Sequence, residues 1–377
     1  MPNLNRRLLM AALAPLTMFS FLPGRAVAAG TVLFAPKPGV PTISSSWGSG
    51  GTQLTGLRIR QLRVSGNPAL VAARFRKSKR IAWAEPDRRM HTLAEPLRKS
   101  EWALDYLHVE KGWSFAGLNG NFGLTGAPIG IVDTGVDSHH EDLKGRIRAC
   151  AASASGRVKE DVCDDRDGHG THVAGIAAAN STNGLGIAGI AAASPILSCR
   201  ALSGLGSGST ADVAACIVWL ARNGAKVINL SLGGPDSSTL HAAVRFAADS
   251  GVLVVAAAGN DGSATNSWPA AYPEVMSVAA LDPNGARADY SSWNRDVEIS
   301  APGTGVLSLK RGGGYVRMSG TSMATPMVSG AAALIWNAKG RSATAARSAL
   351  DHAVRDLGTR GRDSKYGFGA LDLALLA

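Results

Sequence analysis

From about residue 101 onward, short apolar segments alternate with longer alanine-rich segments, and this alternation constrains the fold more than any other feature of the chain. Five apolar runs have the length and composition of buried strands: 127–136, 195–202, 225–234, 251–260 and 275–281. Segments with helical periodicity lie between them, at 169–179, 210–224 and 239–251. Strands that alternate with helices in this way form parallel pairs joined by right-handed crossovers, and the helices cover both faces of the sheet. The sequence therefore predicts an α/β fold of three layers around a mostly parallel central sheet.

The charge of the chain is concentrated near its beginning. Residues 1–94 carry 14 lysines and arginines against two acids, whereas residues 95–377 carry 25 against 26. A net charge of +11 would ordinarily suggest binding to nucleic acid or to a membrane surface. Because the excess belongs wholly to the first quarter, we expect no nucleic-acid partner.

The first 28 residues have the pattern of a secretory signal peptide. Arg6 and Arg7 precede an apolar run from Leu8 to Leu22, and Ala26 to Ala28 supply a small-residue cleavage site. An uncleaved membrane anchor is the alternative, but the apolar run is short for a membrane span. We expect a secreted or periplasmic protein with no membrane attachment after this segment is removed.

A small basic module follows the signal segment. Residues 30–55 are rich in Gly, Pro and Ser and are expected to form a loop or a weak strand. Residues 54–64 and 80–87 have strand-like patterns, and residues 67–75 have a helical one. The polar segment 91–100 is predicted to be a linker. The module is therefore expected to be a small α+β domain that precedes the large one.

The chain has four cysteines, and export makes disulfides the expected state of an even number. Proximity in the sequence favours the pairs Cys150–Cys163 and Cys199–Cys216. Each pair would close a loop of roughly 15 residues, which contributes about 3 kcal/mol in the chain-entropy model. Four buried thiols are the alternative. No Cys or His spacing indicates a zinc site.

Four polar residues lie where elements of the predicted sheet end or where its helices begin. Asp133 ends the run Ile129–Val132, Asn260 ends the run 251–259, His169 begins a helix and Ser322 opens the last helical segment. In open parallel sheets, chemistry gathers at the carboxyl ends of the strands. We therefore expect these side chains to meet at one edge of the sheet.

These four residue types suit nucleophilic catalysis. A serine hydroxyl needs a base within hydrogen-bond reach, and a histidine base needs a carboxylate that fixes its tautomer. A helix N-terminus and the side chain of Asn260 could both stabilise an oxyanion. Taken alone, Asp133 and Asn260 could be turn residues and Ser322 a helix cap. His169 could have only a structural role in its loop, in which case His172 would be the catalytic base.

Three segments resemble the Asp, His and Ser signatures of the subtilisin-like serine peptidases, the subtilase family. They are GIVDTGVDSHHEDL (130–143), DGHGTHVAGIAAA (167–179) and SGTSMATPMVSGAAAL (319–334), and YGFGALDLALL (366–376) is similar to the last segment of that family. The order Asp, His, Ser also fits it. The resemblance implies that Asp133 orients His169, that His169 is the general base, that Ser322 is the nucleophile and that Asn260 is the oxyanion donor. His172 would be structural.

The resemblance also implies where a substrate binds. An extended peptide would pair with one segment of the chain, and two further segments would form the walls of the main specificity pocket. Ser267 is expected near the base of that pocket and Asp261 at its rim, which leaves a neutral and a basic preference both open. The three segments comprise Gly206, Ser207 and Gly208, then Ser231, Leu232 and Gly233, then Ala257, Ala258 and Gly259.

A structural calcium ion is a further expectation from the resemblance. Asp142 matches a calcium ligand of relatives, and the loop 180–186 occupies the place where other ligands are expected. Its length and residues differ from the best-known pattern, and Asp142 could instead cap or pair locally. No cofactor is required for the chemistry.

Residues 29–94 resemble the inhibitory prodomain of such peptidases, with residues 67–91 similar to the end of that module. The expected domains are thus a signal peptide (1–28), a prodomain (29–94) and a peptidase domain (95–377), with maturation cleavage within roughly 88–100. The prodomain would act as an inhibitor and folding template of its own chain, because a large parallel sheet has many non-local contacts. A monomer that acts on proteins or peptides is expected.

The sequence therefore predicts an exported serine endopeptidase that forms an acyl-enzyme and processes itself. A catalytically silent homologue that binds peptides is a second hypothesis. An acid-active serine-carboxyl peptidase would have Glu in place of the base and Asp in place of the oxyanion donor, unlike His169 and Asn260. An esterase or lipase would have a Gly-x-Ser-x-Gly motif, whereas Ser322 lies in Gly-Thr-Ser-Met-Ala.

Overall fold

The computed structural model describes residues 30–39, 52–54, 58–64, 67–86, 95–118, 123, 125–338 and 342–376. The chain divides into two compact units, Met1–Thr92 and Leu93–Ala377. The predicted signal peptide, residues 1–28, lies outside the described residues. Among the described residues, no helix is long and apolar enough to cross a membrane.

The smaller unit contains an antiparallel sheet and one helix. The sheet order is β2-β3-β1-β4, and the helix α1 packs on β1 and β4. Residues 30–36 form a paired strand within this sheet, not the loop or weak strand expected from their glycine and proline content. The edge-to-face pair Phe34–Phe75 joins strand and helix in the core. The elements are β1 Gly30–Pro36, β2 Thr52–Gln53, β3 Arg60–Val64, α1 Pro68–Arg76 and β4 Ile81–Pro86.

The larger unit is built on a sheet with the order β15-β16-β12-β11-β10-β9-β5-β8-β6-β7. All pairs from β16 to β6 are parallel, and the two outermost pairs are antiparallel. The sheet strands are β5 Ile129–Asp133, β6 Ile147–Ala154, β7 Arg157–Glu160, β8 Ile196–Arg200, β9 Val227–Leu230, β10 Leu253–Ala257, β11 Val275–Leu281, β12 Val297–Pro302, β15 Val354–Arg355 and β16 Ala370–Leu371. The predicted mostly parallel sheet is confirmed.

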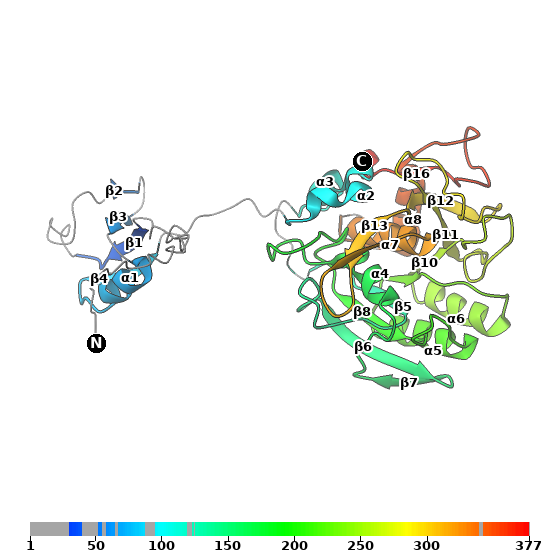
Figure 1. The fold of residues 1–377 in the computed structure, drawn as a ribbon, viewed down its shortest axis with the longest axis horizontal. Coiled ribbons are helices and arrows are strands. Elements are labelled where there is room, and N and C mark those ends of the chain that lie inside the picture. Colours follow the sequence, from blue (N-terminus) through cyan, green and yellow to red (C-terminus); the bar gives the residue numbers. More distant parts are fainter. Residues whose placement is uncertain are drawn as a thin grey trace, which may run out of the picture. The chain divides into compact units, whose positions relative to one another are not determined.

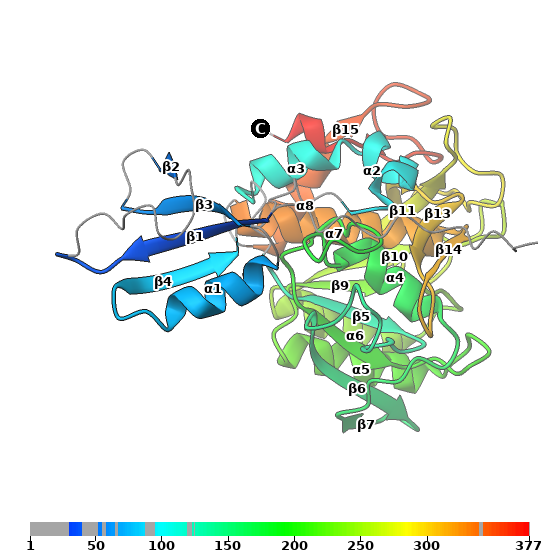
Figure 2. The same ribbon diagram turned by 60° about the vertical axis from the view of Figure 1, so that its left-hand side comes forward.

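Helices cover both faces of this sheet (Figures 1 and 2). α4 and α7 pack together on one face, and α5 and α6 pack together on the other. A separate hairpin, β13 Val306–Leu309 and β14 Tyr315–Met318, contacts α4. The helices are α2 Trp102–Tyr106, α3 Val109–Phe115, α4 His169–Ala178, α5 Thr210–Arg222, α6 Ser238–Asp249, α7 Thr321–Ala338 and α8 Ala343–His352, with 3₁₀ turns at Arg98–Ser100 and Leu373–Leu375.

Strand β5 shows why both faces are apolar. All five of its residues are buried, and Ile131 belongs to the core under α4 and α7, whereas Val132 belongs to the core under α5 and α6. Successive side chains of a strand point to opposite faces, so a strand between two helical layers must be apolar throughout. The predicted three layers are confirmed, and the carboxyl end of β5 is left as the place where a polar side chain can be held.

The sequence patterns indicated five strands of the large sheet and four of the helices that cover it, α4, α5, α6 and α7. They did not indicate β6, β7, β12, β15 and β16, which are short, partly exposed or rich in polar residues. The linker was predicted over residues 91–100, but residues 95–100 belong to the larger unit. Leu97 donates its N–H to the carbonyl of Gly186 at 2.8 Å, and Glu95 is only 4% exposed.

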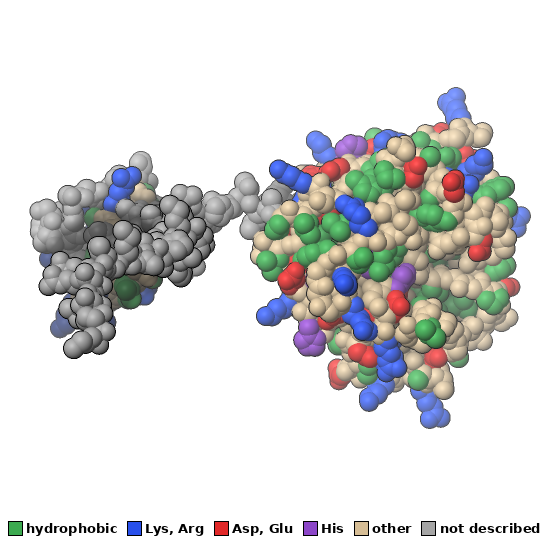
Figure 3. Space-filling view, viewed as in Figure 1, with side chains coloured by type: hydrophobic (Ala, Val, Ile, Leu, Met, Phe, Trp, Pro, Cys, Tyr) green, Lys and Arg blue, Asp and Glu red, His purple; other side chains and the backbone are tan. Residues whose placement is uncertain are grey.

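Both predicted disulfides are present in the structure. Cys150–Cys163 ties β6 to the loop that follows β7, and Cys199–Cys216 ties β8 to α5. No described cysteine is free. Lys, Arg, Asp and Glu side chains are scattered over the face of the larger unit shown in Figure 3. This mixture agrees with the nearly neutral composition of residues 95–377.

Candidate active site

Asp133 and His169 come together at the carboxyl end of β5. Asp133 is the last residue of this strand and is 1% exposed, and His169 is the first residue of α4. The Nδ1 atom of His169 lies 2.8 Å from Oδ1 of Asp133. The same oxygen accepts the N–H of Thr134 at 2.7 Å. The carboxylate therefore fixes the orientation of the imidazole and leaves its Nε2 atom for other partners.

The charge around His169 changes its basicity. Burial alone lowers the pKa of His169, but the carboxylate of Asp133, with smaller contributions from Asp167 and Asp165, raises it to about 9. Acids near an imidazole favour its protonated form. An imidazolium formed in this place is thus well stabilised, and the neutral base is fully available only at alkaline pH.

A buried carboxylate that the sequence analysis did not single out shapes the loop before His169. Asp165 is 8% exposed and accepts hydrogen bonds from the hydroxyl of Thr134 at 2.8 Å and from the N–H of Gly168 at 2.9 Å. It also accepts the N–H of Asp167 at 3.0 Å and both the N–H and the hydroxyl of Thr171. These bonds join the end of β5 to the first turn of α4 and so hold Asp133 opposite His169.

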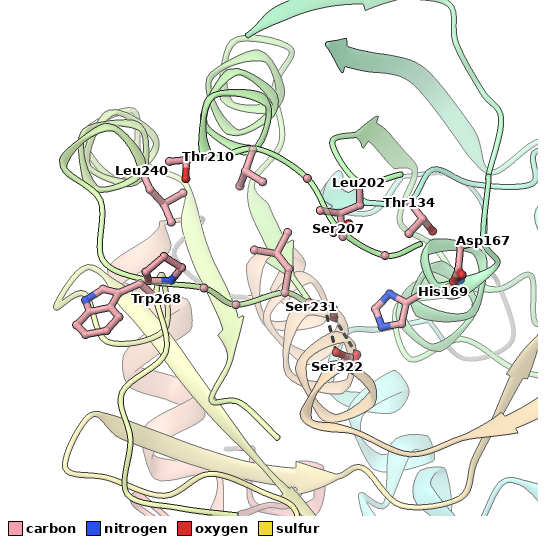
Figure 4. Close-up of a pocket in the computed structure, with 17 residues that line it drawn as sticks. Thr134, Asp167, His169, Leu202, Ser207, Thr210, Ser231, Leu240, Trp268 and Ser322 are labelled. Carbon is pink, nitrogen blue, oxygen red and sulfur yellow. Dashed lines mark hydrogen bonds between the residues drawn. The ribbon is translucent and has the colours of Figure 1, made fainter. Parts of the chain in front are cut away.

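Ser322 lies in the first turn of α7, at the same edge of the sheet. Its hydroxyl donates to the carbonyl of Ser231 at 3.1 Å, and the hydroxyl of Ser231 donates to the carbonyl of Ser322 at 2.8 Å. The hydroxyl of Ser322 therefore does not cap its own helix. Ser322 and His169 line one cavity, and Figure 4 shows their side chains facing each other across it.

A chain of buried polar groups lies beneath Ser322, and sequence reasoning missed it. The hydroxyl of Ser329 donates to Oδ1 of Asn229 at 2.9 Å, and Nδ2 of Asn229 donates to the hydroxyl of Ser231 at 2.9 Å. Ser231 then bonds to the carbonyl of Ser322. Asn229 is the one polar residue of β9, in the segment VINL, and that exception in an apolar strand was the available signal.

Asn260 and Thr321 form the other side of the site. The N–H and the hydroxyl of Thr321 each lie 2.9 Å from Oδ1 of Asn260. Because both donors hold this oxygen, the Nδ2 group of Asn260 is left to face the cavity that Asn260 and Ser322 line. The N–H groups of the first turn of α7 have no acceptor within the helix. A side-chain donor and a helix N-terminus therefore meet beside Ser322.

His172 has a structural setting. It is fully buried on α4, and its Nε2 atom lies 3.1 Å from the carbonyl of Val316 in β14. Burial lowers the pKa of His172 to about 4, so the ring is neutral in the folded protein. The structure thus separates the two histidines of the motif, with His169 at the cavity and His172 between α4 and the β13–β14 hairpin.

Two cavities adjoin Ser322, and most of the segments expected to contact a substrate line them. The first, the His169 pocket, has a volume of about 420 Å³, and His169, Gly206, Ser207, Gly208 and Ser231 are among its lining residues. The second, the Asn260 pocket, has a volume of about 220 Å³, and Ala257, Gly259, Asn260, Asp261 and Ser267 are among its lining residues. Leu232 and Gly233 line both. Ala258 lines neither and is buried.

The residues expected at a calcium site gather around the loop 180–186. Asp142 is fully buried and accepts hydrogen bonds from Nδ2 of Asn183 and the N–H of Ile187. Glu95 is buried beside this loop, and neither of its carboxylate oxygens has a hydrogen-bond partner among the described residues. Burial raises the pKa of Glu95 to about 7, the nearby backbone N–H groups of residues 183–185 act against this shift, and the charge of Asp142 adds to it. Two adjacent buried carboxylates fit a hard cation.

The donor set for such an ion is small. In the described part of the chain, no group of three or more His, Cys, Asp and Glu side chains is arranged to hold a metal. A calcium ion would therefore depend on Asp142 and Glu95 together with amide and carbonyl oxygens of the loop 180–186. The sequence analysis named Asp142 and this loop but missed Glu95.

The fold and this site define a class. A parallel α/β sheet that carries an aspartate, a histidine and a serine in this chain order, with an asparagine beside the serine, is the arrangement of a subtilisin-like serine peptidase. The model of the Subtilase family matches residues 125–369. The chain belongs to this family, and the resemblance seen in its motifs is confirmed. The predicted enzyme class, a subtilisin-like serine endopeptidase, is confirmed at the level of the family.

Several characterised relatives are similar to this chain. The thermophilic serine proteinase of Bacillus sp. (strain AK1) is 43% identical over 65% of this chain and 60% of its own length. Thermitase of Thermoactinomyces vulgaris is 42% identical over 61% of this chain and 81% of its own length. Subtilisin Savinase of Lederbergia lenta is 44% identical over 57% of this chain and 78% of its own length. The chain thus spans about three fifths to four fifths of these relatives.

Proposed function

We propose that this chain is an exported serine endopeptidase that hydrolyses peptide bonds of protein substrates and is made as a self-processing precursor. Asp133, His169 and Ser322 form its catalytic triad, and Asn260 is the side-chain donor of its oxyanion hole. The observation that carries the proposal is the 2.8 Å contact between Nδ1 of His169 and Asp133 at the rim of a cavity that Ser322 also lines.

The first half of the reaction forms an acyl-enzyme. The hydroxyl of Ser322 leaves the carbonyl of Ser231 by rotation about its Cα–Cβ bond and turns toward Nε2 of His169. Its oxygen attacks the scissile carbonyl carbon while its proton passes to His169. Asp133 stabilises the imidazolium that results. The same proton then goes to the leaving amine, the C–N bond breaks, and the acyl group stays on Ser322.

Charge that develops on the carbonyl oxygen is stabilised by Nδ2 of Asn260 and by the backbone N–H of Ser322. Both groups are held before the reaction, the first by Thr321 and the second by the start of α7. Preorganised donors of this kind supply a large part of the rate enhancement in acyl transfer. In the second half, water attacks the ester carbonyl while His169 takes its proton; that proton then passes to the oxygen of Ser322 as the ester C–O bond breaks and the acid product leaves.

The remaining parts of the proposal rest on the sequence and on the setting of the larger unit. The signal pattern of residues 1–28 and the two disulfides support export. Residues 29–94 are proposed to be the inhibitory prodomain, so that one chain carries both the inhibitor and the enzyme. The protein is proposed to be a monomer. A structural calcium ion on Asp142 and Glu95 would neutralise two buried carboxylates and hold the start of the peptidase domain on the loop 180–186.

Mass spectrometry after treatment with an organophosphonate tests this function. The processed wild type should be labelled at Ser322 and should hydrolyse casein, and Ser322→Ala should do neither. Ser322→Ala should also accumulate as a chain that retains the residues upstream of 88–100. Ser138→Ala, which removes a hydroxyl elsewhere on the surface, should behave as the wild type. Folded wild type that resists the label would identify a silent homologue, and normal maturation of Ser322→Ala would assign the processing to another enzyme.

A further inference from the structure

The two pockets that adjoin Ser322 share an electrostatic character. Among the residues that line the His169 pocket, Asp167 is the only acid, and none is Lys or Arg. Among those that line the Asn260 pocket, Asp261 is the only acid, and again none is Lys or Arg. Each side of the nucleophile therefore carries one carboxylate with no Lys or Arg beside it in the lining of its pocket.

Asp167 lies beside the catalytic histidine. It is exposed, and one of its oxygens accepts the N–H of His169 at 3.1 Å. Its neighbours Asp164 and Arg166 pair with each other, and Arg311 donates to the carbonyl of Asp165, so these cations are engaged elsewhere. Figure 4 shows Asp167 at the same end of the pocket as His169, with Leu240 and Trp268 at the opposite, apolar end.

Asp261 follows the oxyanion donor in the chain. It is exposed at the mouth of the Asn260 pocket, and only its N–H is tied down, by the hydroxyl of Ser292 at 3.2 Å. No described cation forms an ion pair with either Asp167 or Asp261. Both carboxylates are thus free to pair with a charge that a ligand brings.

An extended peptide can reach both carboxylates with neighbouring residues. Leu232 and Gly233 line the two pockets jointly, so a strand that lies along this segment has one pocket on each side. Successive side chains of a strand point to opposite sides. One side chain in each pocket therefore means two adjacent residues, and the residue whose carbonyl is attacked occupies the Asn260 pocket, because the oxyanion donor lines it.

We propose that Asp167 and Asp261 are specificity-determining residues that select two consecutive basic residues immediately before the scissile bond. Asp261 receives the basic side chain of the residue whose carbonyl is attacked, and Asp167 receives that of the residue before it. This inference rests on the proposed peptidase function and adds the substrate class to it.

The chain carries such a pair itself. Arg88 and Arg89 lie in the segment in which maturation cleavage is expected, upstream of the buried residue Glu95. These two arginines lie outside the described residues. A peptide that copies residues 84–93, AEPDRRMHTL, is therefore the first substrate to test.

The size of the preference follows from exposure. Both carboxylates are solvent-exposed in the free enzyme, so each ion pair is screened by water and salt. A bound peptide removes part of that water and strengthens the pairs. We expect each matched pair to raise kcat/KM about three- to tenfold at low ionic strength, and less in 1 M salt.

The test measures kcat/KM of the processed enzyme on AEPDRRMHTL and on three matched peptides with Gln-Arg, Arg-Gln and Gln-Gln in place of Arg-Arg. The wild type should rank Arg-Arg first and Gln-Gln last. Asp261→Asn should lose the advantage of the second arginine alone, and Asp167→Asn that of the first alone. Asp249→Asn, which removes an exposed acid at the end of α6, is the control for net charge and should keep the ranking.

The outcomes separate this inference from the function beneath it. Equal rates on all four peptides, by an enzyme that still labels at Ser322, overturn the specificity and leave the peptidase intact. The proposed specificity is also overturned, with the peptidase intact, if Asp167→Asn and Asp261→Asn both keep the wild-type order of kcat/KM on the four peptides. An enzyme that hydrolyses none of the peptides and none of a casein standard, and resists the label, overturns the peptidase itself. Cleavage after Arg89, seen by mass spectrometry of the peptide products, is required in addition.

Discussion

Asn260 keeps its place at the site through Thr321, whose N–H and hydroxyl both bond to its side-chain oxygen. At the scale of single residues, the oxyanion hole therefore depends on a pair of side chains. The hydroxyl of Thr321 acts on substrate only through Asn260, which makes Thr321 a positioning residue.

Substitutions at these two positions should separate the roles. Asn260→Ala should lower kcat about 100-fold or more with little change in KM, because the donor acts mainly in the transition state. Thr321→Val should lower kcat about fivefold by removing one hydrogen bond, and Thr321→Ser should restore it. Steady-state kinetics on a neutral peptide measures both. Full turnover of Asn260→Ala would exclude it from the oxyanion hole.

The basicity of His169 is the second property set by single residues. Its pKa is raised to about 9 because nearby carboxylates favour the imidazolium, so the neutral base appears only as the pH rises through that value. The kcat/KM of the wild type on a neutral peptide should rise with pH with a midpoint near 9, whereas an ordinary histidine would give a midpoint near 6.5.

Asp167→Asn should move this midpoint to lower pH, because one of the contributing carboxylates is lost. Asp249→Asn carries the same change of net charge far from the ring and should not move it. A pH–rate profile of the three proteins on the Gln-Gln peptide makes the comparison free of substrate charge. A midpoint that stays near 6.5 in the wild type would contradict the electrostatic account of this histidine.

At the scale of elements, the loop from β5 to α4 is organised by Asp165. Its two oxygens accept bonds from both ends of the loop, and an amide in its place would offer one acceptor and an unwanted donor. Asp165→Asn should destabilise the protein by about 2–3 kcal/mol, as expected when a buried, charged acceptor is removed.

Thermal unfolding of the Ser322→Ala form, with and without Asp165→Asn, measures this change without self-digestion. Asp249→Asn is the control, since Asp249 is exposed at the end of α6, has no ion pair among the described residues and should change stability by less than about 0.5 kcal/mol. An unchanged melting temperature for Asp165→Asn would mean that the loop holds its shape through other contacts.

Sequence reasoning succeeded for elements with a strong repeat and for residues at their ends. The buried runs of β5, β8, β9, β10 and β11 were predicted, and so was the gathering of Asp133 and His169 at one edge. It failed where a partner lies far along the chain, because no local pattern marks the bond between Asn229 and Ser329. Asp165 was missed since acids are common in turns, and burial cannot be seen in the sequence.

At the scale of the whole molecule, two buried acids, Glu95 and Glu101, lie where the start of the larger unit packs on the rest of that unit. Glu95 and Glu101 are each 4% exposed, and burial raises their pKa values to about 7 and about 8. These acids bind more protons in the folded state than in the unfolded state between about pH 4.5 and pH 8. In the calcium-free protein, stability contributed by these two acids is therefore lost as the pH rises through that window.

Calcium should reverse this loss. Differential scanning calorimetry of Ser322→Ala should show a melting temperature that falls between pH 5 and pH 8 in a chelator and that calcium raises more at pH 8 than at pH 5. Glu95→Gln removes one of the two carboxylates and should weaken the calcium response, whereas the exposed Glu110→Gln should not. A melting temperature indifferent to calcium at both pH values would leave Asp142 with a purely local role.

The reciprocal bonds between Ser322 and Ser231 have a consequence for timing. In the free molecule the hydroxyl of Ser322 rests on the carbonyl of Ser231, and Ser231 begins the segment that walls both pockets. Any peptide that lies along Ser231–Gly233 presses on the group that holds the hydroxyl. Binding of a peptide along this segment and release of the hydroxyl of Ser322 from the carbonyl of Ser231 are thereby coupled, because both involve Ser231.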